Sequence, residues 1–272
     1  ANLAIFAIQV SRIKSVILFL LMIFHVGNLL HSASVDSTNF SPIIKEKRWF
    51  FLHVGVAPFF NSGDWANRYP TSVNIPLSFE YEHRSSYSVG VQYSFFVGSD
   101  VNDSNIYAGM SNEEGYLIDV NGYPAVVRTY QRGYSIRGYA LKNWILHRGR
   151  DHRFLLQAGG GFGWYEHYTK FAFDVDQVPQ IDGIYAGGYA MRTSGPQASQ
   201  QLRLQYINNE AISFSLGLEL AQGFGQRTSP YDFSNQTRNE GTYNDNQWGA
   251  TLSIMIPIKY RDRVSEVDYY MD

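Results

Sequence analysis

Five charged residues stand out because each lies in a segment where polar and apolar side chains alternate. They are Glu80, Glu82, Arg137, Arg203 and Glu219. Alternation places all five on the polar face of their segments, and a charge enclosed away from water is costly unless it is paired. If this face lines the interior of a closed sheet, the five residues predict a cluster of ion pairs. Such a cluster would hold a narrow barrel in register, or gate a narrow pore that opens when the pairs break.

A second set of residues has the side-chain types for covalent catalysis on a lipid, which needs a nucleophile beside a base. Glu166 and His167 lie near the end of one alternating segment, and Ser94, Ser99 and Ser229 lie near the ends of two others. No spacing ties these residues together, and a polar residue at a membrane interface accounts better for His167. We therefore predict no catalytic residue and expect the protein not to be an enzyme.

Acidic residues and glycines offer two further kinds of site. Oxygen ligands could hold calcium or bridge through divalent ions to lipopolysaccharide phosphates, but no segment matches a calcium template, and turn chemistry explains the acids. The glycines lack the following helix and lysine of a phosphate-binding loop. We expect neither a metal nor a cofactor. The acidic residues are Asp100, Asp103, Glu113, Glu114, Asp119, Asp174, Asp176 and Asp182. The glycines are Gly159, Gly160, Gly161 and Gly163.

Composition excludes several classes of protein. The chain has 272 residues, and 22 Lys and Arg against 24 Asp and Glu give a formal net charge of -2. That balance lacks the basic surface on which nucleic-acid binding depends, so we expect no nucleic-acid partner. The sequence contains no Cys, which excludes disulfides and thiolate metal sites.

Eight segments alternate with a period of two, the pattern of a β-strand with one apolar and one polar face. We expect strands near residues 49–60, 73–82, 87–95, 129–146, 154–164, 201–206, 212–224 and 251–260. The first and fourth alternate less cleanly than the others. In the fourth the phase slips near Ala140 and Leu141, as a β-bulge would cause.

The connections between these strands alternate strictly in length. The short ones lie at 84–86, 147–152 and 208–210, and the long ones at 61–71, 100–128, 171–197 and 229–244. An up-and-down antiparallel transmembrane β-barrel has this asymmetry, with tight turns on the periplasmic side and long loops outside. The sequence therefore predicts an all-β chain that forms such a barrel from eight strands.

The polar face indicates that the apolar face meets lipid. It carries mostly Gly, Ser, Gln, Asn and Ala, whereas a face in bulk water is usually rich in Lys and Glu. Small residues suit the interior of an eight-stranded barrel, which is just wide enough for side chains to fill. Aromatic residues near the strand ends fit the girdles at the two membrane interfaces. A sheet in hydrocarbon must close, because an unpaired amide there costs several kcal/mol.

The N-terminal segment has the features of a secretory signal. Arg12 and Lys14 precede the apolar run 16–24, and the small residues 32–34 follow. The run is about half the ~20 residues that span a bilayer as a helix. We therefore predict a signal peptide with an extended start at 1–34. A periplasmic N-terminal segment at 35–47, the barrel at 48–260 and a short periplasmic tail at 261–272 would follow.

Over residues 48–260 the chain resembles the small eight-stranded outer membrane β-barrel proteins of Gram-negative bacteria, the OmpA/OmpX-like group. The final strand carries the resemblance, because its alternating apolar residues end in an aromatic one, like the assembly signal of that group. These residues are Leu252, Ile254, Ile256, Ile258 and Tyr260. In that group the aromatic residue commonly ends the barrel or the protein, whereas residues 261–272 follow here. This tail is too short to be a peptidoglycan-binding domain.

The resemblance implies location in the cell outer membrane and insertion by the barrel assembly machinery. We expect an integral membrane protein with a structural, surface-interaction or adhesion role exerted through its long extracellular loops. The expected partners are outer membrane lipid and lipopolysaccharide, and a surface or outer membrane protein. Two alternatives stay open at this point: a narrow porin-like channel for small solutes, and a lipid-modifying outer membrane enzyme.

Overall fold

The computed structural model describes residues 49–83, 86–102, 106–107, 109–149, 152–173, 178–208 and 212–259. The predicted signal peptide, the segment 35–47, Tyr260 and the tail 261–272 lie outside these residues. Within the described part of the chain, no helix has both the length and the apolar character needed to cross a membrane.

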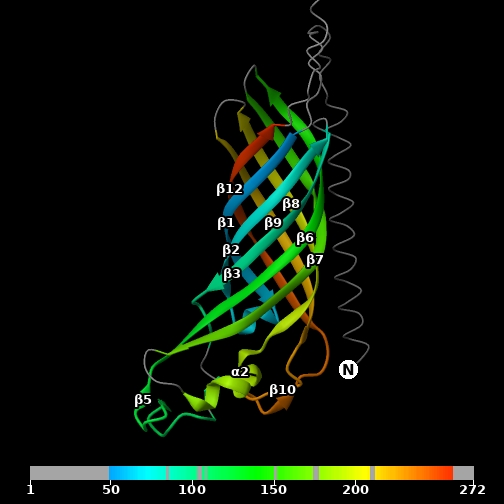
Figure 1. The fold of residues 1–272 in the computed structure, drawn as a ribbon. Coiled ribbons are helices and arrows are strands. Elements are labelled where there is room, and N and C mark those ends of the chain that lie inside the picture. The colour runs from blue at the N-terminus through cyan, green and yellow to red at the C-terminus, as the bar shows by residue number, and fades with distance from the viewer. Residues whose placement is uncertain are drawn as a thin grey trace, which may run out of the picture. The chain divides into compact units, whose positions relative to one another are not determined.

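Eight antiparallel strands form a closed ring (Figure 1). Each strand pairs with the strands before and after it around the ring, and the first pairs with the last in the register Phe50 to Ile258 and Val54 to Ile254. The predicted fold class, an eight-stranded up-and-down barrel, is confirmed. The strands are β1 (Trp49–Gly63), β2 (Thr71–His83), β3 (Tyr87–Gly98), β6 (Val127–Arg148), β7 (His152–Phe173), β8 (Thr193–Asn208), β9 (Ser213–Arg227) and β12 (Tyr243–Lys259).

The outer face of the ring carries rows of exposed apolar side chains. On β9, Leu216 and Leu218 are 57% and 60% exposed, and on β12 Leu252 and Ile254 are exposed as well. In water such rows would form an apolar patch far larger than soluble monomers expose, whereas in a bilayer they are the surface that lipid covers. A closed ring satisfies every strand amide in hydrocarbon without water. The chain is therefore an integral membrane β-barrel.

The bulge predicted near Ala140 and Leu141 is wrong. The pairing of β6 with β3 runs without interruption through this region, and the register shift against β7 lies between Ile145 and His147. Tyr139 and Leu141 are apolar residues that point into the barrel, where both are buried. In the sequence, two inward apolar residues look like a change of phase although the backbone has none.

Several strands extend further beyond the lipid belt than the alternation indicated. β7 ends at Phe173 rather than near residue 164, and β8 begins at Thr193 rather than near residue 201. On β7 the outward side chains above Trp164 are Glu166, Tyr168 and Lys170. Polar outward residues end the apolar alternation, but the backbone ladder continues because it depends on pairing and not on side-chain polarity.

The barrel interior holds large aromatic side chains as well as the small residues expected there. Tyr139 and Tyr165 both point inward and are buried. A Cβ atom added at Gly90 would lie 2.6 Å from the ring of Tyr139, and one at Gly223 would lie 2.5 Å from the ring of Tyr165. Each of these rings therefore packs directly against backbone, and the lack of a side chain on the facing strand makes the room.

The long connections fold into a layer of short elements at one end of the ring, which we call the loop layer (Figure 1). A small apolar core holds it together, with Leu117, Ala125, Val178 and Ile181 all buried. A hydrogen bond from Phe233 N to Gly188 O joins the last loop to the helix of the third. The elements are η1 (Trp65–Asn67), β4 (Leu117–Ile118), β5 (Pro124–Ala125), η2 (Pro179–Ile181), α2 (Gly183–Ala190), β10 (Tyr231–Asp232) and β11 (Thr237–Arg238).

Replacing Leu218 by Arg tests whether lipid covers the exposed rows. Leu218 lies in the middle of the apolar row of β9, so a charge there should lower the free energy of unfolding by about 2–4 kcal/mol. Urea titration of the folded protein in lipid, followed by its heat-modifiable gel mobility, measures the change. Tyr123→Arg is the control, because Tyr123 is 69% exposed in the loop layer. Equal effects of the two substitutions would contradict a lipid-facing position for Leu218.

Candidate functional site

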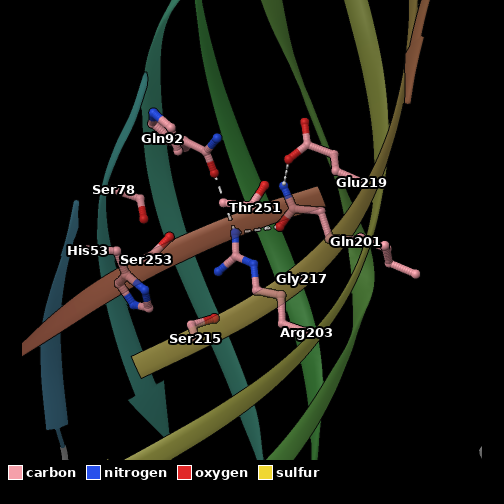
Figure 2. A pocket seen from close by; sticks show the side chains of 12 residues that line it. His53, Ser78, Gln92, Gln201, Arg203, Ser215, Gly217, Glu219, Thr251 and Ser253 are labelled. Carbon is pink, nitrogen blue, oxygen red and sulfur yellow. Dashed lines mark hydrogen bonds between the residues drawn. The ribbon is translucent and has the colours of Figure 1, made fainter. Parts of the chain in front are cut away.

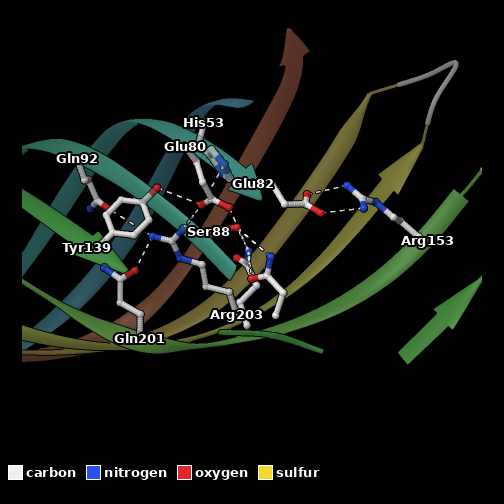
Figure 3. Close-up of polar contacts among 11 residues, drawn as sticks. His53, Glu80, Glu82, Ser88, Gln92, Tyr139, Arg153, Gln201 and Arg203 are labelled. Carbon is white, nitrogen blue, oxygen red and sulfur yellow. Dashed lines mark hydrogen bonds and ion pairs between the residues drawn. The ribbon is translucent and has the colours of Figure 1, made fainter. Parts of the chain in front are cut away.

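The middle of the barrel interior is organised around the carboxylate of Glu80, which β2 places fully out of solvent contact. It accepts hydrogen bonds from Tyr139 Oη at 3.0 Å, Gln157 Nε2 at 3.0 Å and Arg203 Nη1 at 3.1 Å. His53 Nε2 lies 3.5 Å from the same carboxylate. Figure 3 shows His53, Tyr139 and Arg203 converging on Glu80 from different strands. We call this group the Glu80 network, and it satisfies a charge that would be very costly alone.

A second ion pair joins Arg137 on β6 to Glu219 on β9. Arg137 Nη2 donates to Glu219 Oε2 at 2.6 Å, and Arg137 Nη1 contacts the other carboxylate oxygen. Gln201 connects this pair to the Glu80 network, because its Oε1 accepts from Arg203 at 2.5 Å and its Nε2 donates to Glu219 at 3.4 Å. The structure thus brings four of the five predicted residues into one connected set.

Glu82, the fifth predicted residue, pairs elsewhere. Its two oxygens accept from Arg153 Nη1 at 2.8 Å and Nη2 at 2.6 Å, a bidentate arrangement (Figure 3). Arg153 was not among the expected residues, because the strand was expected to begin one residue later, at Phe154. Arg153 falls on the same face of the strand as Leu155 and Gln157, which point inward. Extending the alternation by one residue would therefore have identified Arg153.

Little free space remains around these pairs. One cavity of about 10 Å³ lies among Ser78, Gln92 and Arg203 (Figure 2), and a second of about 10 Å³ lies further along the barrel, among Asn74, Ser135 and Gln247. A volume of this size holds about one water molecule. Neither cavity is wide enough to be a path for a solute.

The inner end of the barrel interior, on the side of the short turns, is filled by apolar side chains. Phe51, Leu155, Ile207 and Met255 are buried against one another from four different strands. We call this cluster the inner closure. Because these side chains are packed and apolar, they exclude water from the interior on that side.

The outer end is closed by a group centred on Trp65, which η1 inserts among inward-facing residues. The Trp65 ring stacks on His167, with centroids 4.3 Å apart, and on Tyr165 at 5.8 Å. Asp245 Oδ2 accepts from Tyr165 Oη at 2.6 Å and lies 3.0 Å from His167 Nε2. We call this group the outer closure. Asp245 was not among the expected residues, because β12 begins at Tyr243 and not near residue 251, where the alternation begins.

The connection from β1 to β2 is fixed beside the outer closure. The hydroxyl groups of Tyr69 and Thr169 lie 2.5 Å apart, and Arg68 is buried beside Tyr69. Burial lowers the pKa of the Arg68 guanidinium, against the smaller opposing effects of Tyr69 and Asp232. Burial also raises the pKa of Tyr69. Both side chains are thus enclosed at the base of the loop layer, which anchors that layer to the barrel.

The residues weighed for lipid catalysis do not come together. Glu166 and His167 are neighbours on β7 and therefore point to opposite faces. Glu166 is ion-paired with Arg192 at 3.1 Å on the outer face, whereas His167 lies inside the barrel. Ser94 accepts a hydrogen bond from Gln92 within the lumen, and Ser229 donates to Tyr231 O. Within the described residues, neither His167 nor Glu166 forms a hydrogen bond or ion pair with any of these serines.

Two of the acidic residues in the described loops serve a turn and a helix end. Asp119 Oδ1 accepts from the backbone amides of Asn121 and Tyr123, each at 2.8 Å, and Asp182 accepts from Gly183 N at the start of α2. Asp103, Asp174 and Asp176 lie outside the described residues. Within the described ranges, His, Asp and Glu side chains nowhere form a group of three placed to hold a metal ion.

The residues that carried the resemblance lie on β12, at the seam where the barrel closes. Leu252, Ile254, Ile256 and Ile258 all point to the lipid-facing side, and β12 pairs with β1 along this stretch. Tyr260, the aromatic end of the pattern, is outside the described residues. Recognition of this strand by the assembly machinery stays a prediction.

Comparison with known proteins gives matches in structure only. No family model and no curated protein sequence matches the chain. Neisserial surface protein A is 9% identical, with 78% of this chain and 97% of that one covered and a TM-score of 0.43. Ail of Yersinia pestis, solved with the heparin analogue sucrose octasulfate, is 11% identical, with 77% and 99% covered and a TM-score of 0.40.

The outer membrane protease OmpT of Escherichia coli is 10% identical, with 82% of this chain and 99% of that chain covered and a TM-score of 0.33. Likeness at this level carries no conclusion about activity. Our placement of the barrel in a membrane rests on its own closed ring and apolar exterior.

The Glu80 network can be tested by removing one partner or both. Glu80→Ala should lower the free energy of unfolding by about 3–5 kcal/mol, because it leaves the Arg203 charge enclosed without its carboxylate. The double variant Glu80→Met with Arg203→Met should recover most of that loss, since no charge is then uncompensated. Urea unfolding in detergent, followed by tryptophan fluorescence, compares the two. A double variant as unstable as the single one would show that the pair is not the source of the effect.

Proposed function

We propose that the protein is a non-conducting outer membrane barrel that presents its loop layer as a binding surface to a protein outside the membrane. The observation that carries this proposal is a set of tyrosines exposed on a loop layer that has its own core. Tyr116 is 50% exposed, Tyr123 69% and Tyr185 57%. Tyrosine offers a large contact area with few rotatable bonds and is enriched where proteins recognise one another.

The loops that carry these tyrosines are held in place by their own contacts. Asp119 fixes the turn before Tyr123 by accepting from its amide, and Asn112 Oδ1 accepts from the amide of Tyr116 at 2.8 Å. The buried cluster of Leu117, Ala125, Val178 and Ile181 lies beneath them. A surface already ordered before binding loses little conformational entropy when it binds, which favours recognition.

The filled interior favours this role over a solute channel. Conduction would require the inner closure, the outer closure and the ion pairs between them to open together. An eight-stranded barrel interior is only wide enough for the side chains that fill it. The separation of Glu166 from His167 across β7 likewise gives no support to a lipid-modifying enzyme, since a nucleophile and its base must be in contact.

A photoreactive amino acid at position 123 tests the display role. In intact cells it should form a cross-link to a discrete protein, because Tyr123 lies in the proposed contact surface. Combining it with Tyr116→Ser and Tyr185→Ser should remove most of that product, since neighbouring anchors share the contact energy. The same amino acid at position 218, which faces lipid, is the control. A cross-linked protein seen equally from both positions would argue against recognition by the loop layer.

Planar bilayer recordings separate the display role from the channel. The unaltered protein should show no conductance steps. Glu219→Ala and Arg203→Ala should stay silent as well, because each substitution leaves both the inner and the outer closure in place. Steps in the unaltered protein, or steps that appear with either substitution, would favour a gated pore. Heat-modifiable gel mobility verifies that every variant tested is folded.

A further inference from the structure

Two cationic side chains face outward just above the lipid belt, on β6 and β7. Arg132 lies opposite Tyr168 in the ladder, and Lys170 lies opposite Tyr130, one outward position further from the membrane. Arg132 Nη1 donates to the backbone oxygen of Gln131, and its guanidinium lies 5.1 Å from the ring centre of Tyr130. Neither Arg132 nor Lys170 forms an ion pair with any residue in the described ranges.

An apolar groove adjoins Arg132 on the outer face. It encloses about 520 Å³ and opens to the outside, with Phe60, Val73, Val97 and Tyr130 among its lining residues and Arg132 at its edge. The groove exists because β3 ends at Gly98, which pairs with Gln131, whereas β6 continues beyond this pair to Val127. Figure 1 shows β6 and β7 running on past the end of β3. The resulting step lies at the outer edge of the apolar belt.

We propose that this groove and the cations beside it bind a phosphorylated lipid of the outer leaflet. An acyl chain would lie in the groove, and the phosphate would contact Arg132, with Lys170 as the second cation. The planar guanidinium can hold two phosphate oxygens at once, and the ammonium adds a point charge. Basic side chains at a membrane surface attract anionic headgroups through the same attraction between opposite charges.

The other charges at this site leave it positive. Glu166 is neutralised by Arg192, whose guanidinium also lies 4.7 Å from the ring of Tyr168. Asp100 lies at the groove on the β3 side and accepts a hydrogen bond from Thr71 Oγ1 at 2.9 Å. With Arg132 and Lys170 both cationic, an anion is favoured over a cation. Because exposed Phe60 and Val73 continue the apolar belt, the occupant arrives from the membrane, which favours a lipid over a protein.

Native mass spectrometry of the full chain in detergent, with diphosphoryl lipid A as the probe, tests this site. Arg132→Gln should weaken binding about tenfold, because charge-assisted hydrogen bonds to the phosphate are lost. Val73→Trp should also weaken binding, since it fills the groove from an outward position that folding tolerates. Lys142→Gln is the matched control, because Lys142 is an outward, exposed cation near the other end of β6, and it should leave binding unchanged.

Three results would overturn the proposal. Equal losses with Arg132→Gln and Lys142→Gln would mean that the lipid responds to overall charge and not to this site. Equal binding of the dephosphorylated lipid would mean that the groove recognises only the acyl chains. Binding of inorganic phosphate with the same dependence on Arg132 would mean that the site takes the free anion. Heat-modifiable mobility confirms folding of each variant, and none of these results bears on the partner of the loop layer.

Discussion

The structure depends on one constraint: inside hydrocarbon, every backbone amide and carbonyl must find its partner within the protein. A sheet meets this requirement only if its first and last strands pair, as β1 and β12 do along thirteen residue pairs from Trp49–Lys259 to Gly63–Asp245. Closure with eight strands then fixes the width of the interior. Once the ring is closed and narrow, side chains rather than solvent must fill the space within it.

The narrow interior in turn decides how charge is distributed. Glu80, Arg203, Arg137 and Glu219 could not be enclosed singly, and each finds an opposite charge on another strand. These pairs contribute little net stability compared with apolar packing, but breaking one leaves a costly unpaired group. They therefore penalise any sliding of β2 relative to β8, or of β6 relative to β9, across the lumen. The apolar inner closure and the aromatic outer closure complete the exclusion of water at the two ends.

The sequence predicts the barrel well wherever lipid constrains it. Alternation is clear in β9 and β12 because hydrocarbon accepts only apolar side chains on one face. It fails at Glu166, Tyr168 and Lys170, where β7 has left the membrane and its outward face is free to be polar. The inward direction of Glu80 and Glu219 could be derived from the alternation of the residues on either side of them in the sequence. The partners Tyr139, Gln157 and Trp65 could not, since contacts across a barrel depend on tilt and register that no local pattern encodes.

The distribution of available surface favours the outer end of the molecule for the recognition that we propose. Among the described residues, side chains fill the interior around two cavities of about 10 Å³ each, and neither is large enough for a ligand beyond a water molecule. Lipid covers the rows of exposed apolar side chains on the outer face, such as Leu216 and Leu218 on β9. What is left is the loop layer in water and the step between β3 and β6 at the lipid boundary. The loop layer lies in water and therefore suits a protein partner. The step lies at the boundary between lipid and water and therefore suits an amphiphile. A rigid closed ring beneath them holds both in fixed geometry, because its strands cannot slide without breaking enclosed ion pairs.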